Sequence, residues 1–480
     1  MRISSVLYIL GKMLLYFSVI LLTPVFVAQL DGNHSLLPFI YTFAITFLTA
    51  VVLVMFFKSE PGMTAKEGFL IVTLTWLAYA FFGCLPYLFD GTLFTLTDAF
   101  FESMSGFTTT GSTVITQIEG TSKAILFWRS LTQYLGGMGI IVLGIAILPE
   151  ISLGAMQLFK AEVPGPTADR LYPRIKDTAM TLWVVYSILT IAEAVLLKIG
   201  GMTLFDAVNH AFTTMATGGF STSNTSIAGY KSPFIEWVIT FFMFMAGVNF
   251  TLHFHMLHGK ITSYFKSSEF RTYLAIVLIG TLAVALNIHH QIGSSIITTI
   301  RLAAFQLVSI LTTTGYASTD FELWPPFCTV ILFLAMFAGA MAGSTGGGIK
   351  IVRLQLIFKH SFLQIRKLIH PQLVSHIKSQ GRVVPEGVMS TVAGFLQLYI
   401  GIFIFAILII CACGIDFTTS LTAAAACLGN IGPGFGTVGA MDNFAHLPAL
   451  VKNILSFLML LGRLELYTVL AILLPGFWRD

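Results

Sequence analysis

Apolar residues fall into long runs that are separated by short polar or glycine-rich segments. A bilayer core of about 30 Å requires about 20 apolar helical residues to cross it. The pattern therefore predicts an all-α integral membrane protein with ten transmembrane helices. The predicted spans cover residues 13–30, 36–57, 68–88, 125–148, 178–199, 233–257, 271–289, 327–345, 391–413 and 450–474.

The first apolar run admits a second interpretation. Arg2, the apolar stretch and the small residue Ala28 near its end are also typical of a secretory signal peptide. However, Lys12 interrupts the stretch early, and the span at 36–57 is a suitable partner for a retained hairpin. We therefore expect 13–30 to remain in the membrane, with the signal peptide as the alternative.

Four shorter apolar runs each lead into a segment rich in glycine and threonine. At about 12–16 residues they are too short to cross a bilayer, which takes about 20. We therefore predict four re-entrant half-helices, each lying between two spanning helices. They cover residues 95–107, 203–215, 295–311 and 418–429.

Charge is scarce and unevenly placed. Hydrophobic residues make up 56% of the chain and charged residues 10%, against about 25% charge in soluble domains. With the N-terminus in the cytoplasm, most of the 26 lysines and arginines fall on cytoplasmic segments, which is the positive-inside pattern. The predicted orientation is thus a cytoplasmic N-terminus, with all four re-entrant segments opening outside. The lysines predicted to lie outside are Lys123, Lys198, Lys231 and Lys452.

The glycine-rich exits of the four short helices share one pattern. They read FTTTGST with Gly111, MATGGFST with Gly218, LTTTGYAST with Gly315, and GNIGPGFGT with Gly432. Each repeat thus consists of a span, a half-helix, a loop and a second span. Four such units in one chain predict a pseudo-fourfold array around one central pore.

These residue types suit a dehydrated cation. Such an ion needs oxygen ligands in place of its water shell, and converging backbone carbonyls supply them. Glycine permits the φ values that turn successive carbonyls inward, and the partially negative helix C-termini favour a cation. The alternative is that these are ordinary small-residue helix-packing motifs. Four copies on one predicted face favour the ion-filter interpretation.

The four exits, the glycine-rich segment AGAMAGSTGGGIK (338–350) and the arginine of LLGRLELY together resemble the Trk/Ktr/HKT superfamily of cation transporters, and the extra N-terminal spans resemble its TrkH-type members. The resemblance implies one filter glycine per repeat, and glycine at all four positions is similar to the potassium-preferring pattern. The fourth exit departs from the others in having Asn430-Ile431 before the glycine and Pro433 after it. The potassium-coordinating filter residues that we expect are Thr110, Gly111, Thr217, Gly218, Thr314, Gly315, Ile431 and Gly432.

The resemblance also implies the setting of the protein. It implies a pore-forming subunit in the bacterial inner membrane, with potassium as the transported ion, a homodimer of pore chains, and separate cytosolic nucleotide-binding TrkA-like regulatory subunits. We expect no nucleic-acid partner, because no extramembrane segment is long enough to fold as a binding domain. The expected units are an N-terminal two-helix segment at 1–62 and pore repeats at 63–165, 166–262, 263–383 and 384–480.

The eighth predicted span contains a cluster of glycines near mid-membrane. Glycine costs about 1 kcal/mol per helix position relative to alanine, so the cluster should unwind the helix beside water in the pore. We interpret 338–350 as an intramembrane gate, which the resemblance supports. A cytoplasmic surface turn is the alternative, and a phosphate-binding loop is disfavoured because the GK[ST] ending is missing. The expected gate glycines are Gly343, Gly346, Gly347 and Gly348.

Three arginines lie within apolar segments. Arg463 is in the middle of the last span, where an ionised side chain is costly unless it faces a cavity or a partner. We expect it to form a positive barrier below the filter and to contact the gate; a buried ion pair is the alternative. For Arg129 and Arg301 we expect structural pairing with acids such as Glu102.

Other polar residues suggest weaker hypotheses. His253, His255 and His258 do not match the zincin HExxH spacing, so we expect interfacial anchoring rather than a metal site. The five cysteines are scattered singly without CxxC spacing, and we expect no bound cofactor. Five aspartates on the predicted outer side suggest a mild cation-attracting mouth, although helix capping explains Asp98, Asp206 and Asp416 equally well. The five are Asp98, Asp206, Asp320, Asp416 and Asp442.

The sequence thus predicts a potassium-selective, channel-like pore and no enzyme. An alternating-access symporter coupled to Na+ or H+ is the alternative, although such transporters usually carry two repeats. An intramembrane metal or haem oxidoreductase would need paired histidines or cysteines on facing spans, and none stand out.

Overall fold

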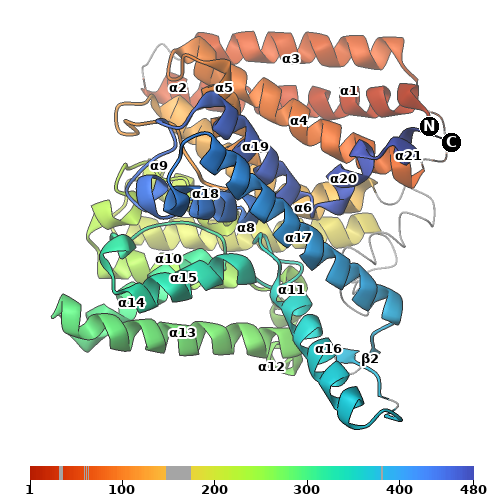
Figure 1. Cartoon of the computed structure of the whole chain (residues 1–480). Helices are drawn as coiled ribbons and strands as arrows, with labels where there is room; N and C mark the ends of the chain where they lie inside the picture. Colours follow the sequence, from red (N-terminus) through yellow and green to blue (C-terminus); the bar gives the residue numbers. More distant parts are fainter. Residues whose placement is uncertain are drawn as a thin grey trace.

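The computed structural model is almost wholly helical (Figure 1), as the apolar pattern predicts. For residues 138–147, 175–179, 292 and 382 only the backbone is described. The structure describes residues 1–31, 36–58, 60, 62, 64–147, 175–293, 295–373, 375–379 and 382–479.

Two antiparallel helical segments at the N-terminus precede the repeats. Helix α1 (Ile3–Ile20), followed by α2 (Thr23–Asp31), packs along α3 (Leu36–Phe56). Gly11 permits this close approach, because a Cβ atom there would meet Leu53 within 3.0 Å. Many large apolar side chains on α3 are exposed on the outer surface, which is consistent with a lipid surrounding.

Each repeat begins with a long helix and continues with a short helix and an extended exit before its second helix. The first helices are α4 (Ala65–Asp90), α8 (Ile175–Ile199), α13 (Ser268–Ile292) and α17 (Glu386–Ala412). The short helices are α5 (Leu96–Phe107), α9 (Leu204–Met215), α14 (Ile296–Leu311) and α18 (Phe417–Gly429). The second helices begin as α6 (Lys123–Ile147), α10 (Pro233–Ala246), α15 (Pro326–Ala338) and α19 (Ala449–Arg463).

The second helices of three repeats are broken. Helix α10 bends by 103° into α11 (Phe250–Leu257), and α19 bends by 118° into α20 (Tyr467–Leu473). In the third repeat, α15 is separated from α16 (Ile351–Ile369) by non-helical residues that coincide with the predicted gate. The sequence predicted only this third break, because the other two lie within apolar runs without a glycine cluster.

The span count follows from helix length and composition. Among the described residues, six helices are long and apolar enough to cross a membrane, and up to eight if each bent pair is one span. The other two predicted spans correspond to α6, whose second half is described by backbone alone, and to α15 with its glycine-rich continuation. Ten spans therefore remain a prediction.

The remaining elements are short. A two-stranded hairpin, in which Lys378 pairs with Val383 and Ser379 with Arg382, follows α16. The two termini lie side by side (Figure 1), and Lys66 Nζ donates to the carbonyl oxygen of Arg479 at 2.8 Å. The short elements not named above are α12 (Thr262–Lys266), η1 (Ser226–Tyr230), η2 (Phe321–Leu323), β1 (Lys378–Ser379), β2 (Arg382–Val383), η3 (Gly436–Val438) and α21 (Pro475–Trp478).

Candidate ion-binding site

The four short helices begin with the same kind of N-cap. A side-chain oxygen of the residue before each helix accepts a hydrogen bond from a backbone N–H in the first turn, which fixes the start of the helix. The capping residues are Thr95, Thr203, Ser295 and Asp416. In Figure 1 these helices lie on the side of the molecule away from the termini.

The exits of the four helices have equivalent backbones. One residue in each exit donates its N–H to the carbonyl oxygen five residues earlier. These bonds are Thr110 to Ser105 (2.9 Å), Gly218 to Thr213 (2.8 Å), Thr314 to Ser309 (2.9 Å) and Ile431 to Ala426 (2.8 Å). The residue before each donor has a positive φ, and so does the glycine after it. The pairs are Thr109 and Gly111, Thr217 and Gly219, Thr313 and Gly315, and Asn430 and Gly432.

This equivalence places the second exit one residue away from the register expected from the sequence. Gly219, with φ of 75°, corresponds to Gly111, Gly315 and Gly432. Gly218 corresponds instead to the residue that precedes those glycines. The motif MATGGFST offers two adjacent glycines, and only the backbone conformation distinguishes them.

The four exits form a closed ring. A Cβ atom built on each positive-φ glycine would come within 3.0 Å of a carbonyl oxygen in the next exit, so only glycine allows this approach. The contacts run from Gly111 to Gly218, from Gly219 to Thr314, from Gly315 to Ile431, and from Gly432 back to Thr110. The expected filter residues therefore lie together around a common centre.

Threonine pairs stand behind two of the exits. Thr108 and Thr110 join their hydroxyls at 2.8 Å, and Thr312 and Thr314 do the same at 2.8 Å. The fourth exit departs from this pattern, as its sequence indicated. There Asn430 Nδ2 donates to the Thr110 hydroxyl at 3.0 Å, which ties the fourth exit to the first.

The predicted gate contacts the inner side of this ring. The N–H of Gly347 donates to the Thr313 hydroxyl at 2.7 Å. The Thr345 hydroxyl donates to carbonyl oxygens at the ends of α9 and α10, those of Met215 (3.1 Å) and Ala246 (3.2 Å). These bonds hold the glycine-rich segment against the second and third repeats, and most of its residues are buried, whereas a surface turn would be exposed.

Arg463 lies at the end of α19 and is buried. Its Nη1 donates to the carbonyl oxygen of Thr345 at 3.0 Å, and its Nη2 to that of Gly136 at 2.8 Å. Arg463 therefore contacts the segment 338–350, as expected from the sequence. Two residues on, Glu465 forms ion pairs with Lys350 at 3.2 Å and with Arg353. Residues at the break after α19 thus contact the segment 338–350 at its middle, through Arg463, and at its end, through Glu465. The sequence analysis did not anticipate the contact of Glu465.

Comparisons with known proteins agree with this architecture. The family profile named TrkH, described as a cation transport protein, matches residues 37–475. The chain belongs to the TrkH family. The potassium uptake protein TrkH of Salmonella typhimurium is 40% identical over 487 residues, and that of Vibrio parahaemolyticus is 41% identical over 489 residues; each match covers 100% of both chains.

The fold of this TrkH-family chain is that of a solved relative. The crystal structure of the potassium transporter TrkH from Vibrio parahaemolyticus has a TM-score of 0.91 to it, with 38% identity and 100% of both chains covered. The chain is therefore a helical membrane protein of TrkH architecture.

Two arginines of this TrkH-family chain make the structural pairs that we expected. Arg129 Nε bonds Glu102 Oε1 at 2.8 Å, and both side chains are almost fully buried. Arg301 Nε bonds Glu236 Oε2 at 2.8 Å. Glu102 also accepts from the N–H of Val114 at 2.8 Å, so the first pair anchors the exit of α5.

One of the histidines, His253, and three of the aspartates have structural partners. The His253 ring bonds the Tyr264 hydroxyl at 2.6 Å and the Met245 carbonyl oxygen at 2.9 Å. Asp416 caps α18 directly, whereas Asp98 and Asp206 lie one turn inside helices capped by threonine. Helix capping thus accounts for Asp416.

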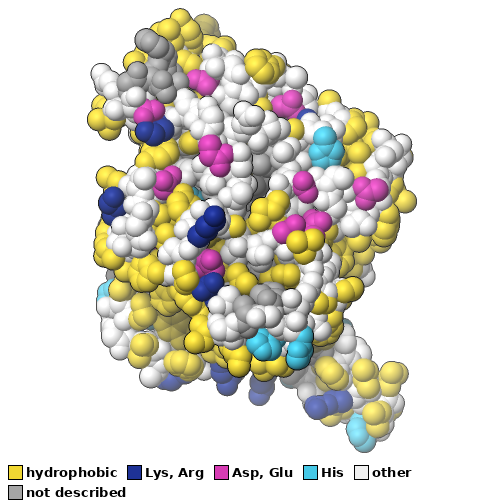
Figure 2. Space-filling model, turned by 90° about the vertical axis from the view of Figure 1, so that its left-hand side faces the viewer, with side chains coloured by type: hydrophobic (Ala, Val, Ile, Leu, Met, Phe, Trp, Pro, Cys, Tyr) yellow, Lys and Arg dark blue, Asp and Glu magenta, His cyan; other side chains and the backbone are white. Residues whose placement is uncertain are grey.

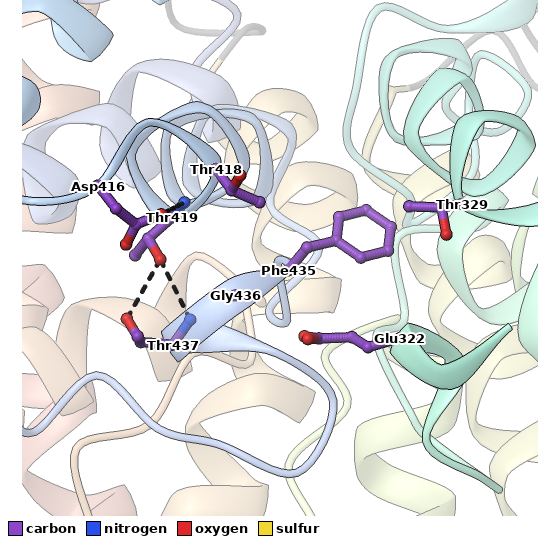
Figure 3. Close-up of a pocket in the computed structure, with 8 residues that line it drawn as sticks. All are labelled: Glu322, Thr329, Asp416, Thr418, Thr419, Phe435, Gly436 and Thr437. Carbon is purple, nitrogen blue, oxygen red and sulfur yellow. Dashed lines mark hydrogen bonds between the residues drawn. The ribbon is translucent and has the colours of Figure 1, made fainter. Parts of the chain in front are cut away.

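The end of the molecule with the ring exits carries scattered acidic side chains (Figure 2). A cavity of about 470 Å³ beside the fourth exit is lined by Asp416 and Thr437 and, across from them, by Glu322 (Figure 3). A hydrogen bond from the Thr419 N–H lowers the pKa of Asp416. Burial, followed by the charge of Asp320, raises the pKa of Glu322.

Proposed function

We propose that this protein is the pore-forming subunit of a potassium uptake system and conducts potassium selectively through a channel-like pore. The observation that carries the proposal is the closed ring of four equivalent exits, in which each glycine lies against a carbonyl oxygen of its neighbour. Rings of backbone carbonyls replace the hydration shell of potassium in selective pores.

The proposed filter has two layers of backbone carbonyls. The inner layer belongs to Thr110, Gly218, Thr314 and Ile431, and the outer layer to Gly111, Gly219, Gly315 and Gly432. Thr217, which we expected to contribute a filter carbonyl, corresponds to Thr109 and Thr313 at the entrance to the inner layer. Each of the four short helices ends at this filter, so their partially negative C-termini favour a cation at the centre.

In this proposal the segment 338–350 is the gate. Its glycines allow the backbone to turn directly beneath the filter, and Arg463 places a positive charge beside it. An ionised arginine at membrane depth repels potassium from the inner end of the path. Opening requires the gate segment to leave Thr313 and Arg463.

The setting of the pore is also proposed. Relatives that match the whole chain are named Trk system potassium uptake proteins, which supports a protein of the bacterial inner membrane that works with further, TrkA-like regulatory subunits. The excess of lysine and arginine on the predicted cytoplasmic segments supports a multi-pass topology with a cytoplasmic N-terminus. Helix α16 extends away from the body (Figure 1) and exposes large apolar side chains, among them Phe358, Phe362 and Leu368. These features support the proposed homodimer.

Flux into liposomes tests the proposal. With the purified protein in potassium-loaded and sodium-loaded liposomes, we expect potassium flux well above that of empty liposomes and a clearly smaller sodium flux. Equal fluxes of the two ions, or no flux above the empty vesicles with protein of either orientation present, would contradict the proposal.

A further inference from the structure

The second exit of the ring lacks the side chains that brace the first and third. Thr108 and Thr110 form a hydroxyl pair behind the first exit, and Thr312 and Thr314 form one behind the third. The corresponding residues of the second exit are Ala216 and Gly218, which have no hydroxyl and leave space behind the strand.

The side chain of Gln133 fills this space. Gln133 lies on α6 of the first repeat and is fully buried. Its Nε2 donates to the carbonyl oxygen of Gly218 at 2.7 Å, and its Oε1 accepts from the N–H of Phe220 at 3.1 Å. The amide therefore bridges the two residues on either side of Gly219. A Cβ atom on Gly218 would meet the Gln133 amide within 3.0 Å.

The other three repeats carry methionine where the first carries this glutamine. Counted from the first helical residue, the position of Gln133 in α6 is held by Met243 in α10, Met336 in α15 and Met459 in α19, all buried. A thioether is a weak acceptor and cannot donate. Among the four exits, the second has Gly218 where the others have threonine or isoleucine. The amide of Gln133 lies beside this exit.

We propose that Gln133 is a positioning residue that sets the cation preference of the filter by holding the Gly218 carbonyl. This inference rests on the proposed function. A carbonyl oxygen has two lone pairs, so one can accept from Gln133 while the oxygen still lies beside Gly111 of the neighbouring exit. Gln133 of the first repeat and Gly218 of the second thus stand where the second and third repeats have Met243 and Thr314.

The proposal predicts a rescue. Gln133→Met leaves the Gly218 carbonyl and the Phe220 N–H without their partner, and we expect the potassium-to-sodium flux ratio to fall about tenfold. Gly218→Thr alone brings the new side chain against Gln133 and should lower the ratio as well. Gly218 does not have a positive φ, so threonine fits its backbone, and the double variant Gln133→Met/Gly218→Thr should return close to the unmodified ratio.

Gln133→Glu keeps the size of the side chain and removes its hydrogen-bond donor. Its carboxylate can still accept from Phe220 but cannot donate to Gly218, so we expect a loss of selectivity like that of Gln133→Met. Thermal stabilisation of the detergent-solubilised protein by potassium over sodium provides a second readout, and it should fall in both single variants.

The outcomes are distinguishable. Selectivity unchanged in Gln133→Glu and Gln133→Met, or a double variant no better than either single variant, overturns the role of Gln133. If the unmodified protein itself does not discriminate potassium from sodium, the proposed filter fails, and the role of Gln133 fails with it.

Discussion

Replacement of Gly315 by serine is expected to reduce selective potassium flux about a hundredfold while the protein still inserts into the membrane. Gly315 has a φ of 79°, and a Cβ atom there would come within 3.0 Å of the Ile431 carbonyl oxygen. The backbone strain and the displaced carbonyl together should raise the free-energy barrier to potassium passage by about 3 kcal/mol, which lowers transport about a hundredfold. Potassium and sodium fluxes in liposomes, with membrane insertion checked separately, measure the effect.

Gly414 provides the matched control. It also has a positive φ, 87°, but nothing lies within 4 Å of the position of its Cβ atom. Gly414→Ser therefore imposes backbone strain without displacing a carbonyl, and we expect its potassium preference to match that of the unmodified protein. A Gly315→Ser variant that keeps this preference would show that the close approach of Gly315 to Ile431 is not needed for selectivity.

Replacement of Arg463 by alanine is expected to increase potassium flux. The change removes a buried positive charge and frees the carbonyl oxygens of Thr345 and Gly136. Because a charge near the centre of a membrane is weakly screened, we expect an increase of about tenfold or more without any activating partner. Tracer potassium uptake into liposomes measures it.

Glu465→Gln distinguishes the effect of the Arg463 charge from the effect of the ion pairs that hold the end of the gate. This variant weakens the pairing with Lys350 and Arg353 and so loosens the end of the gate, but it leaves Arg463 in place. We expect a smaller increase in flux with unchanged ion preference. If Arg463→Ala conducts no faster than the unmodified protein, Arg463 neither repels potassium in the pore nor holds the gate segment closed.

The repeat architecture could be predicted because its signals are local. Each short helix is too short to span a membrane and ends at a glycine-rich exit, and both properties can be read from the sequence. The pairing of Arg129 with Glu102 could be anticipated for a similar reason, since a buried charge needs a partner.

Other features depend on geometry that the sequence does not display. Gly218 and Gly219 are adjacent and chemically identical, and only the hydrogen bond to Thr213 and the φ values set the register. The break before α11 lies in an apolar run, where Asn249, which caps the new helix, was the available signal. Gln133 was visible as an amide within an apolar span, but its partner in another repeat was not.

Heavy monovalent cations test the central claim most directly. In crystals of the protein grown with rubidium or thallium in place of potassium, anomalous scattering locates the bound ion. The account predicts a peak on the axis of the ring, among the carbonyl oxygens of Thr110, Gly218, Thr314 and Ile431. An empty ring in well-diffracting crystals, or ions bound only elsewhere in the protein, would contradict it.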